Sequence, residues 1–246
     1  PSSMHTFGGQ VAQSVRKARE QVAALLNCSP DEVFFTSCGT ESDNAAIRST
    51  VEAYPGKRHI ITSRVEHPAV RTTCRYLEAK GYRLTELPVD GKGQLNLDHL
   101  HEALTPDTSI VSIMHANNET GVVFPIEEIA EIVKEHGAVL HCDAVQTVGK
   151  LTLDLSRTPI DLLSISGHKL HAPKGIGVLY IRRGTKFPPF LVGGHQESGK
   201  RAGTETVPYI VGLGKACELA REPRAEEQTR VRNLRDKLEN AITQKC

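Results

Sequence analysis

The chain has 246 residues, and its 30 lysines and arginines almost balance 29 aspartates and glutamates, for a formal net charge of +1. This balance excludes a broad basic surface for nucleic acid or an anionic membrane, and the 4% aromatic share argues against stacking on single-stranded bases. Charged or polar residues interrupt every apolar run before the roughly 18 residues that span a bilayer, so neither a nucleic-acid partner nor a membrane partner is predicted.

The cysteines and the first residues indicate the compartment. Six cysteines are spread singly, without a C-x-x-C pair, which is typical of reduced thiols. No basic stretch leads into an apolar one at the start of the chain, so either the start is missing or, as we expect, the protein is cytoplasmic. His168 and His171 have the spacing of a helical ligand pair, but no four-ligand set at zinc spacing exists, and no metal is predicted.

The first elements are a helix, a strand and a second helix. Residues 10–26 carry one apolar stripe at spacings of three and four, which predicts a helix. Residues 33–35 form a β-branched and aromatic run that predicts a strand. A small-residue turn follows and leads into a helix at residues 41–47, with Thr40 as the expected N-cap and Asp43 in the first turn.

The same alternation continues along the chain. Helices are predicted at residues 69–79 and 126–133, and strands at residues 59–62, 84–89, 109–114, 138–140, 162–165 and 177–181. Strands that alternate with helices indicate an α/β fold with a mostly parallel sheet flanked by helices on both faces. A glycine-rich polar loop follows at residues 193–203, and two helices close the chain, the last at residues 225–241 with an apolar line of Val231, Leu234 and Leu238.

Polar residues follow the predicted strands. Ligands of an open parallel sheet bind outside the carboxyl ends of its strands, so these residues are expected to converge there: Gly39, Thr40, His67, Asn118, Asp143, Gln146, Ser166, His168 and Lys169. Each has a plainer interpretation alone. Gly39 and Thr40 suit a turn followed by a helix cap, and His67-Pro68 suits the start of a helix. Asp143 could be an N-cap, and Lys169 could be a solvated surface lysine.

Taken together, these residues favour a phosphate-bearing cofactor. A helix N-terminus at Gly39 and Thr40 binds phosphate through free backbone N–H groups. Neither G-x-x-x-x-G-K-[ST] nor a strand-linked G-x-G-x-x-G occurs, which argues against nucleotide sites. A phosphate site, a lysine for a Schiff base, an acidic partner for a ring nitrogen and a stacking ring are what pyridoxal 5′-phosphate (PLP) requires.

Six motifs in order carry a specific resemblance. They are T-S-C-G-T-E-S-D-N from Thr36, V-E-H-P-A-V from Val65, A-N-N-E-T-G from Ala116, H-C-D-A-V-Q from His141, S-G-H-K from Ser166 and G-G-H-Q-E-S-G-K-R-A-G-T-E from Gly193. With these motifs the chain resembles cysteine desulfurases of the NifS type, within the fold-type I, class V PLP enzymes. Selenocysteine lyases are similar. The fold this implies is the large domain of a fold-type I PLP-dependent transferase.

The resemblance implies roles for residues around the cofactor ring. Lys169 would hold the cofactor and shuttle the proton of the substrate Cα. Asp143 would pair with the ring nitrogen, and Gln146 with the phenolic oxygen. His67 would stack on the ring and assist proton transfer.

It also implies roles around the phosphate and the substrate. The phosphate would be held by Gly39, Thr40, Ser166 and His168. Asn118 would lie against the cofactor and the substrate carboxylate. Thr204 would reach the phosphate bound by the other subunit, so a homodimer is expected.

The implied reaction converts L-cysteine to L-alanine and passes the sulfur, as a persulfide on an enzyme cysteine, to a sulfur-acceptor or scaffold protein in iron–sulfur cluster or related pathways. Here the sequence departs from the resemblance. Residues 1–222 are expected to form the PLP-binding large domain and residues 223–246 to begin a helix towards a carboxy-terminal small domain that is absent. That domain would carry the nucleophilic cysteine and the substrate arginine.

The six cysteines of the chain leave the function open. Cys38 and Cys142 are interpreted as small buried hydrophobic residues rather than nucleophiles. Two alternatives therefore stay open beside cysteine desulfurase: a selenocysteine lyase or other β-eliminating PLP enzyme, and a catalytically silent dimerisation or scaffold domain.

Overall fold

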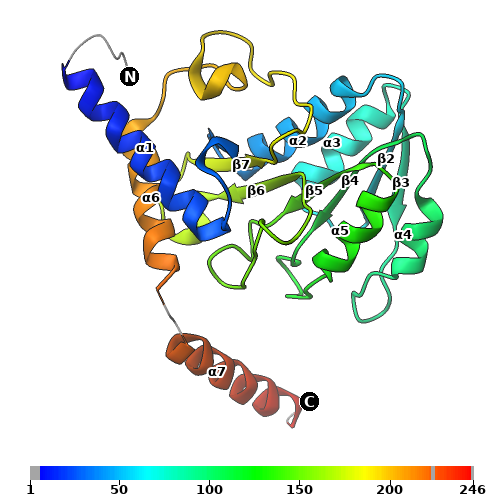
Figure 1. The fold of residues 1–246 in the computed structure, drawn as a ribbon. Coiled ribbons are helices and arrows are strands. Elements are labelled where there is room, and N and C mark those ends of the chain that lie inside the picture. The colour runs from blue at the N-terminus through cyan, green and yellow to red at the C-terminus, as the bar shows by residue number, and fades with distance from the viewer. Residues whose placement is uncertain (1–5, 223–224, 245–246) are drawn as a thin grey trace.

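The computed structural model describes residues 6–222 and 225–244, and its central element there is a seven-stranded sheet (Figure 1). The strand order is β1-β7-β6-β5-β4-β2-β3. Its strands are β1 (Val33–Thr36), β2 (His59–Ser63), β3 (Arg83–Leu87), β4 (Thr108–Met114), β5 (Val139–Asp143), β6 (Leu162–Ser166) and β7 (Gly177–Ile181). All except β3 are buried along their whole length, polar residues such as His59, Ser112 and His141 included, so these strands lack the polar face of a half-solvated sheet.

The sheet is mostly parallel, as predicted. Strands β3, β2, β4, β5 and β6 run parallel, while β7 is antiparallel to both β6 and β1. In register, Met114 of β4 pairs with Asp143 of β5. The carboxyl ends of β2, β4, β5 and β6 consequently meet at one edge of the sheet, where the predicted polar residues follow.

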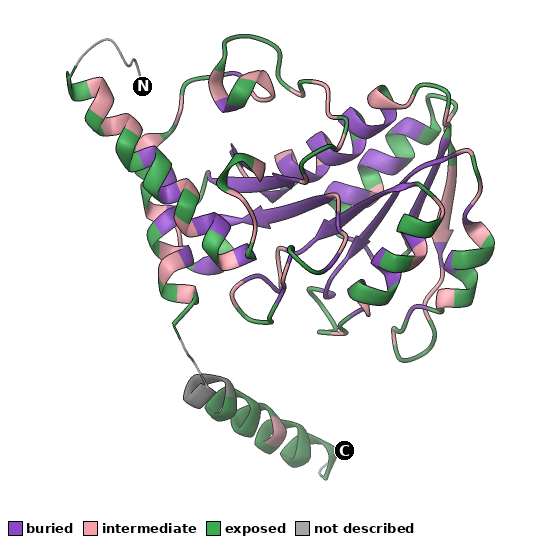
Figure 2. Ribbon diagram, viewed as in Figure 1, coloured by how far each residue is buried: buried purple, intermediate pink, exposed green. Residues whose placement is uncertain are grey.

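Helices cover both faces of the sheet, which confirms the predicted fold class (Figure 2). Their bounds are α1 (Thr6–Leu26), α2 (Gly39–Ala53), α3 (Pro68–Glu78), α4 (Leu97–Ala103), α5 (Ile126–Glu135), α6 (Val207–Ala220) and α7 (Ala225–Thr243). Apolar residues of α2 and α3 pack with Ile60 and Ile110 on one face. Those of α1, α4, α5 and α6 pack together on the other, and so the sheet is enclosed between two apolar layers.

Several predicted boundaries move. β5 begins at Val139 and continues to Asp143, which is therefore the last strand residue rather than the first loop residue. β3 begins and ends earlier than predicted. The short helix α4 was not predicted, because it has one buried residue, Leu100, and starts on a side-chain cap in which Asn96 accepts from the Asp98 amide.

The predicted cap of α2 was wrong. The N-cap is Cys38, whose backbone is extended, and the Ser42 amide donates to the Cys38 carbonyl. The acidic residue of the first turn is Glu41. Asp43 instead lies on the buried side of the helix, where it is 2% exposed.

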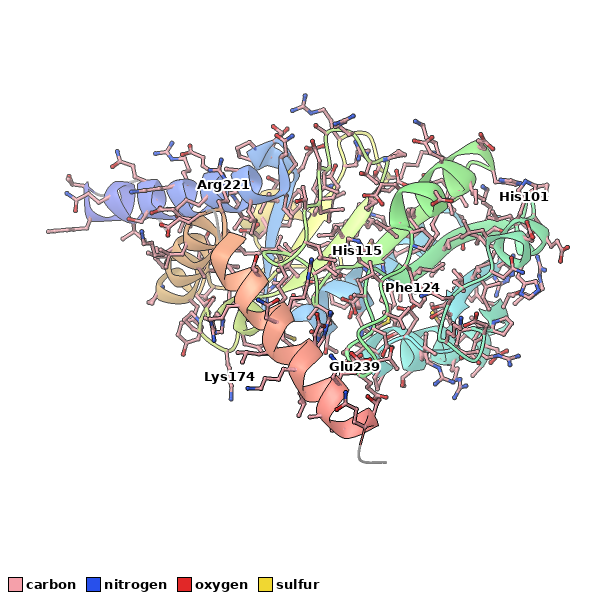
Figure 3. The ribbon with its side chains drawn as sticks, turned by 90° about the horizontal axis from the view of Figure 1, so that it is seen from below. His101, His115, Phe124, Lys174, Arg221 and Glu239 are labelled. Atoms are coloured by element: carbon pink, nitrogen blue, oxygen red, sulfur yellow. The ribbon has the colours of Figure 1, made fainter. Side chains whose placement is uncertain are left out.

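Helix α7 is drawn apart from the sheet and its helices in Figure 1, and in the view from below it lies in front of them, with Glu239 labelled (Figure 3). Its predicted apolar line is exposed, since Val231, Leu234 and Leu238 are between 50% and 63% exposed. The predicted boundary at 222/223 adjoins residues 223–224, which lie outside the described residues, as do residues 1–5 and 245–246. The division into a large domain and a linking helix stays a prediction.

Candidate active site

A cavity of about 220 Å³ opens at the carboxyl edge of the sheet. It is lined by nine of the predicted site residues: Gly39, Thr40, His67, Asn118, Asp143, Gln146, Ser166, His168 and Lys169. Cys38, Asp43, Met114, Ala116 and Val145 complete the lining. The carboxyl ends of five strands, β1, β2, β4, β5 and β6, thus bring these residues together, as expected for an open, mostly parallel sheet.

Lys169 lies in the 3-10 helix Gly167–Leu170 (η2), directly after β6. Its side chain is exposed and reaches the cavity. The turn depends on Gly167, because a Cβ there would lie 2.7 Å from Ile176 Cγ2 and 2.9 Å from the Ile176 carbonyl oxygen. The Gly167 amide donates to that same carbonyl. Close contact between η2 and Ile176, the residue before β7, therefore sets the position of the lysine.

The amino-terminal end of α2 faces the same cavity. A Cβ at Gly39 would lie 3.0 Å from Val145 Cγ2 and 3.3 Å from Ser166 Cβ, so glycine keeps this corner open. The free amides of a first helical turn attract anions. Across from them, Ser166 Oγ lies 2.9 Å from His168 Nδ1. The corner combines the donors that a phosphate monoester needs.

Asp143 lines the same cavity from the end of β5. It is 6% exposed, and its Oδ1 accepts a 2.9 Å hydrogen bond from the Val145 amide. Burial raises the pKa of Asp143, and the Val145 hydrogen bond and nearby His67 oppose that rise. A cation beside the carboxylate would offset burial, and a protonated ring nitrogen is such a cation. Half-buried Gln146 lines the cavity next to it.

His67 both caps helix α3 and lines the cavity. It is the N-cap of α3, where its Nδ1 accepts a 3.2 Å hydrogen bond from the Ala69 amide, and Pro68 begins the helix as predicted. This hydrogen bond assigns the ring proton of the neutral tautomer to Nε2. The cap fixes the ring at the cavity wall without using Nε2.

The two neighbouring asparagines have different positions. Asn117 builds the turn after β4: its Oδ1 accepts from the Glu119 and Thr120 amides, and its Nδ2 donates to the Val65 carbonyl. Asn118 is exposed and lines the cavity. At the base of this turn the Phe124 amide donates to the His115 carbonyl, and Figure 3 labels both residues.

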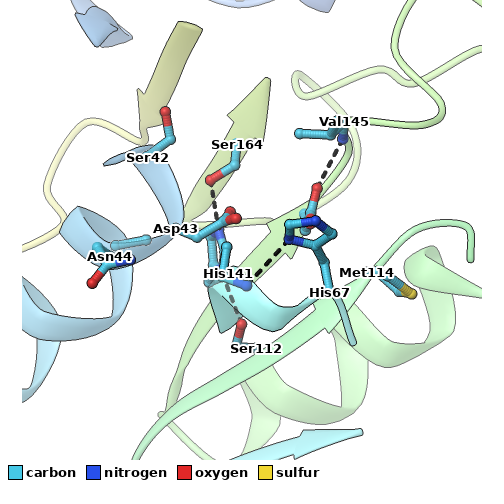
Figure 4. Close-up of polar contacts among 12 residues, drawn as sticks. Ser42, Asp43, Asn44, His67, Ser112, Met114, His141, Val145 and Ser164 are labelled. Carbon is cyan, nitrogen blue, oxygen red and sulfur yellow. Dashed lines mark hydrogen bonds and ion pairs between the residues drawn. The ribbon is translucent and has the colours of Figure 1, made fainter. Parts of the chain in front are cut away.

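Asp43 is a cavity residue that the sequence analysis did not identify. Its carboxylate lies 3.6 Å from His141, whose ring nitrogens contact Ser112 and Ser164 at 2.8 and 2.9 Å (Figure 4). His141 and Asp143 are two residues apart on β5 and so share a face. Asp43 faces that column from α2. Only its place after Gly39-Thr40 and on the apolar side of α2 could have indicated this.

Thr204, Cys38 and Cys142 lie in three different environments. Thr204 lies outside the main cavity and lines a smaller one of about 90 Å³ with Ser37 and Arg201, so its expected role stays a prediction. Cys142 is buried, as expected, but Cys38 is half-buried and lines the main cavity, because it caps α2 instead of packing in the core.

Within residues 6–222 and 225–244, no group of three or more histidine, cysteine, aspartate or glutamate side chains is arranged to hold a metal ion. None of the helices in those ranges has both the length and the apolar character needed to cross a bilayer.

Residues 1–245 match the family model of aminotransferase class V. The chain is 61% identical to a cysteine desulfurase of Trichormus azollae and 54% identical to the cysteine desulfurase NifS of Azotobacter vinelandii, over 100% and 98% of its length. It covers 61% and 60% of those two proteins. The chain therefore spans about three fifths of the length of these curated relatives.

Solved structures agree with this relationship. A NifS-like protein superposes with a TM-score of 0.93 at 42% identity, covering 98% of this chain and 67% of the other. A structure described as SspA in complex with cysteine gives a TM-score of 0.88 at 38% identity, covering 96% of this chain and 69% of the other. The chain belongs to the aminotransferase class-V family. Its fold is that of the fold-type I PLP enzymes, and the family depends on PLP.

Proposed function

We propose that this chain is the PLP-binding large domain of a cysteine desulfurase, which converts L-cysteine to L-alanine and transfers the sulfur to an enzyme cysteine as a persulfide. The observation that carries the proposal is one cavity that unites Lys169, buried Asp143, His67 and the start of α2. The relatives named cysteine desulfurase support the substrate and the reaction.

The residues present fit PLP. Gly39, Thr40, Ser166 and His168 would hold the phosphate, because the Gly39 corner is open and provides amide, hydroxyl and imidazole groups. Asp143 would accept a hydrogen bond from the protonated ring nitrogen, and Gln146 would donate to the phenolic oxygen. His67 would lie against the ring, and Asn118 against the ring and the substrate carboxylate. Lys169 would hold the cofactor through Nζ.

Each group in the cavity then has a chemical task. When bound, PLP supplies an electron-withdrawing ring that stabilises negative charge at the substrate Cα. Asp143 favours that charge distribution by keeping a proton on the ring nitrogen. Lys169 Nζ takes and returns the proton at Cα, and His67 Nε2, left free by the helix cap, assists at the cavity mouth.

Sulfur transfer needs a further group. A thiolate attacks the substrate sulfur, so an accessible thiol of low pKa is required. Burial instead raises the pKa values of Cys28, Cys74, Cys142 and Cys217. We assign the nucleophile to the part of the relatives that this chain does not span. We also propose a cytoplasmic homodimer, with Thr204 reaching the partner's phosphate, that passes sulfur to an acceptor or scaffold protein.

The visible absorption spectrum tests cofactor binding. After PLP is added and the excess removed, the parent chain should retain a band that L-cysteine shifts. Lys169→Ala should lose or alter that band, while Lys174→Ala, at another exposed lysine five residues away, should keep it. Absence of a retained band in the parent would overturn the proposal and favour a silent scaffold domain.

Product analysis distinguishes the reactions. Cysteine and selenocysteine are supplied separately to the PLP-loaded chain together with a small-molecule thiol, which takes the place of the enzyme cysteine as sulfur acceptor, and alanine and the released chalcogen are measured. Alanine and sulfur from cysteine support desulfurase activity. Selenium release alone would indicate a selenocysteine lyase instead.

A further inference from the structure

The glycine-rich strap, residues 193–204, is held against the body of the protein by a buried carboxylate. In Figure 1 it is the segment between β7 and α6 that carries a short helix above the sheet. Glu197 lies within it and is 8% exposed. Its Oε2 accepts a 2.9 Å hydrogen bond from the Phe35 amide, so the strap is attached directly to β1.

Arg19 of α1 completes this attachment. Its two terminal nitrogens donate to the two oxygens of Glu197 at 2.8 Å each, which makes a bidentate ion pair. The same guanidinium donates to the Val33 carbonyl and stacks 4.6 Å from the centre of the Phe35 ring. Because Arg19 is fixed by these contacts, it is a rigid partner for Glu197.

The backbone at this point is strained. Glu197 has φ 46° and ψ 46°, and Ser198 has φ 55° and ψ 32°, so two successive residues with side chains adopt the left-handed conformation. L-residues disfavour this region because Cβ approaches the following carbonyl oxygen. The strap therefore needs attachment to hold this turn.

A second ion pair joins the strap to the candidate active site. Arg201 Nε and Nη2 donate to the two oxygens of Glu41 at 2.7 and 3.1 Å. Glu41 Oε2 also accepts from the Ser37 amide at 2.8 Å, just before the start of α2. Thr204 and Ser37 line the same small cavity, so the strap ends beside the anion-binding end of α2.

We propose that Glu197 is a positioning residue: its ion pair with Arg19 holds the strap in the strained turn that sets Thr204 beside the start of α2. That Thr204 is thereby placed at the cofactor phosphate of the partner subunit rests on the function proposed above. The conformational consequence concerns this chain alone and can be tested without cofactor.

Limited trypsin digestion tests the attachment, because Lys200 and Arg201 are cleavage sites within the strap. In Glu197→Gln, without added PLP, cleavage at these sites should be about tenfold faster than in the parent. The control Glu86→Gln removes the ion pairs with Arg71 and Arg75, away from the strap, and should leave this cleavage rate unchanged. Equal rates in Glu197→Gln and the parent would overturn the proposal.

Rescue by glycine tests the strain. Ser198→Gly relieves one left-handed position, so it should slow strap cleavage several-fold when added to Glu197→Gln. A merely structural loss of packing would not respond to this change. Unchanged or faster cleavage in the double variant would show that the turn is not what the ion pair holds.

Retention of PLP separates this inference from the proposed function. If the parent retains PLP, Glu197→Gln should retain it with about tenfold lower affinity, by titration of the absorption band. A freely cleaved strap with unchanged PLP affinity would overturn the positioning of Thr204. If the parent retains no PLP, the proposed function fails, while the digestion still decides whether Glu197 holds the strap.

Discussion

The Nε2 atom of His141 lies 3.6 Å from Oδ1 of Asp43, and the two side chains are 0% and 2% exposed. Burial lowers the pKa of His141 to about 3, so the ring is neutral. Burial, with nearby Asp143 second, raises the pKa of Asp43 well above its usual range. Because the His141 ring is neutral, the contact is a polar link rather than an ion pair.

Removing the histidine should destabilise the protein. His141→Ala leaves a cavity and removes the shared partner of Ser112 and Ser164, so we expect a loss of about 3 kcal/mol in the free energy of unfolding. Urea denaturation measures it. His99→Ala, on an exposed face of α4, should change stability by less than about 0.5 kcal/mol. Equal effects of the two changes would show that the link contributes nothing.

Glu66 should make stability depend on pH. Its Oε1 accepts from Ser63 Oγ and the Met114 amide, while Oε2 is buried without a hydrogen-bond partner. Burial raises the pKa of Glu66 from its ordinary 4.5 to about 8. Between these values the unfolded state binds fewer protons, so stability falls as pH rises, by at most about 1.4 kcal/mol per pH unit from this group.

Glu66→Gln tests this sign. Because the parent loses stability as the pH rises towards the Glu66 pKa of about 8, the stability of the variant relative to the parent should increase from pH 5 to pH 8. Urea denaturation at pH 5 and at pH 8 measures this difference. Exposed Glu78→Gln should leave the pH dependence of the parent unchanged. A difference between Glu66→Gln and the parent that stays constant with pH would contradict a buried, protonated Glu66.

Gly39→Ala should weaken PLP binding more than folding. The new methyl group would lie 3.0 Å from Val145 Cγ2, at the corner assigned to the phosphate. We expect about a tenfold rise in the apparent Kd for PLP, measured from the absorption band. Gly9→Ala is the matched control, because no atom lies within 4 Å of a Cβ there. If both variants bind PLP like the parent, the phosphate does not lie at this corner.

Arg182→Lys should loosen the segment between β5 and β6. Arg182 Nε donates to the Ile160 carbonyl at 2.7 Å, and Nη2 donates to the carbonyls of Leu155 and Thr158 at 3.0 and 2.6 Å. Lysine cannot reproduce this planar set, so we expect a loss of about 2 kcal/mol in stability. The neighbouring Arg183→Lys, at an exposed ion pair with Asp31, should leave the stability close to that of the parent. Hydrogen exchange of residues 150–161 would locate the effect.

The sequence alone was sufficient for the fold class and for most of the cavity lining. Buried strands of a parallel sheet are short, mainly apolar runs, and the residues that follow each run lie at the carboxyl edge. That rule is enough to group His67, Asn118, Asp143 and Lys169, which line one cavity. It depends only on local pattern and chain direction.

Tertiary structure decided the remaining features, because they depend on partners distant in sequence. Asp43 enters the cavity only because α2 packs against β5 and β6 and brings it to His141. Glu197 meets an arginine 178 residues earlier, and no spacing rule predicts such a pair. Periodicity reports which side of an element is buried, whereas the packing of separate elements determines which buried polar groups face one another.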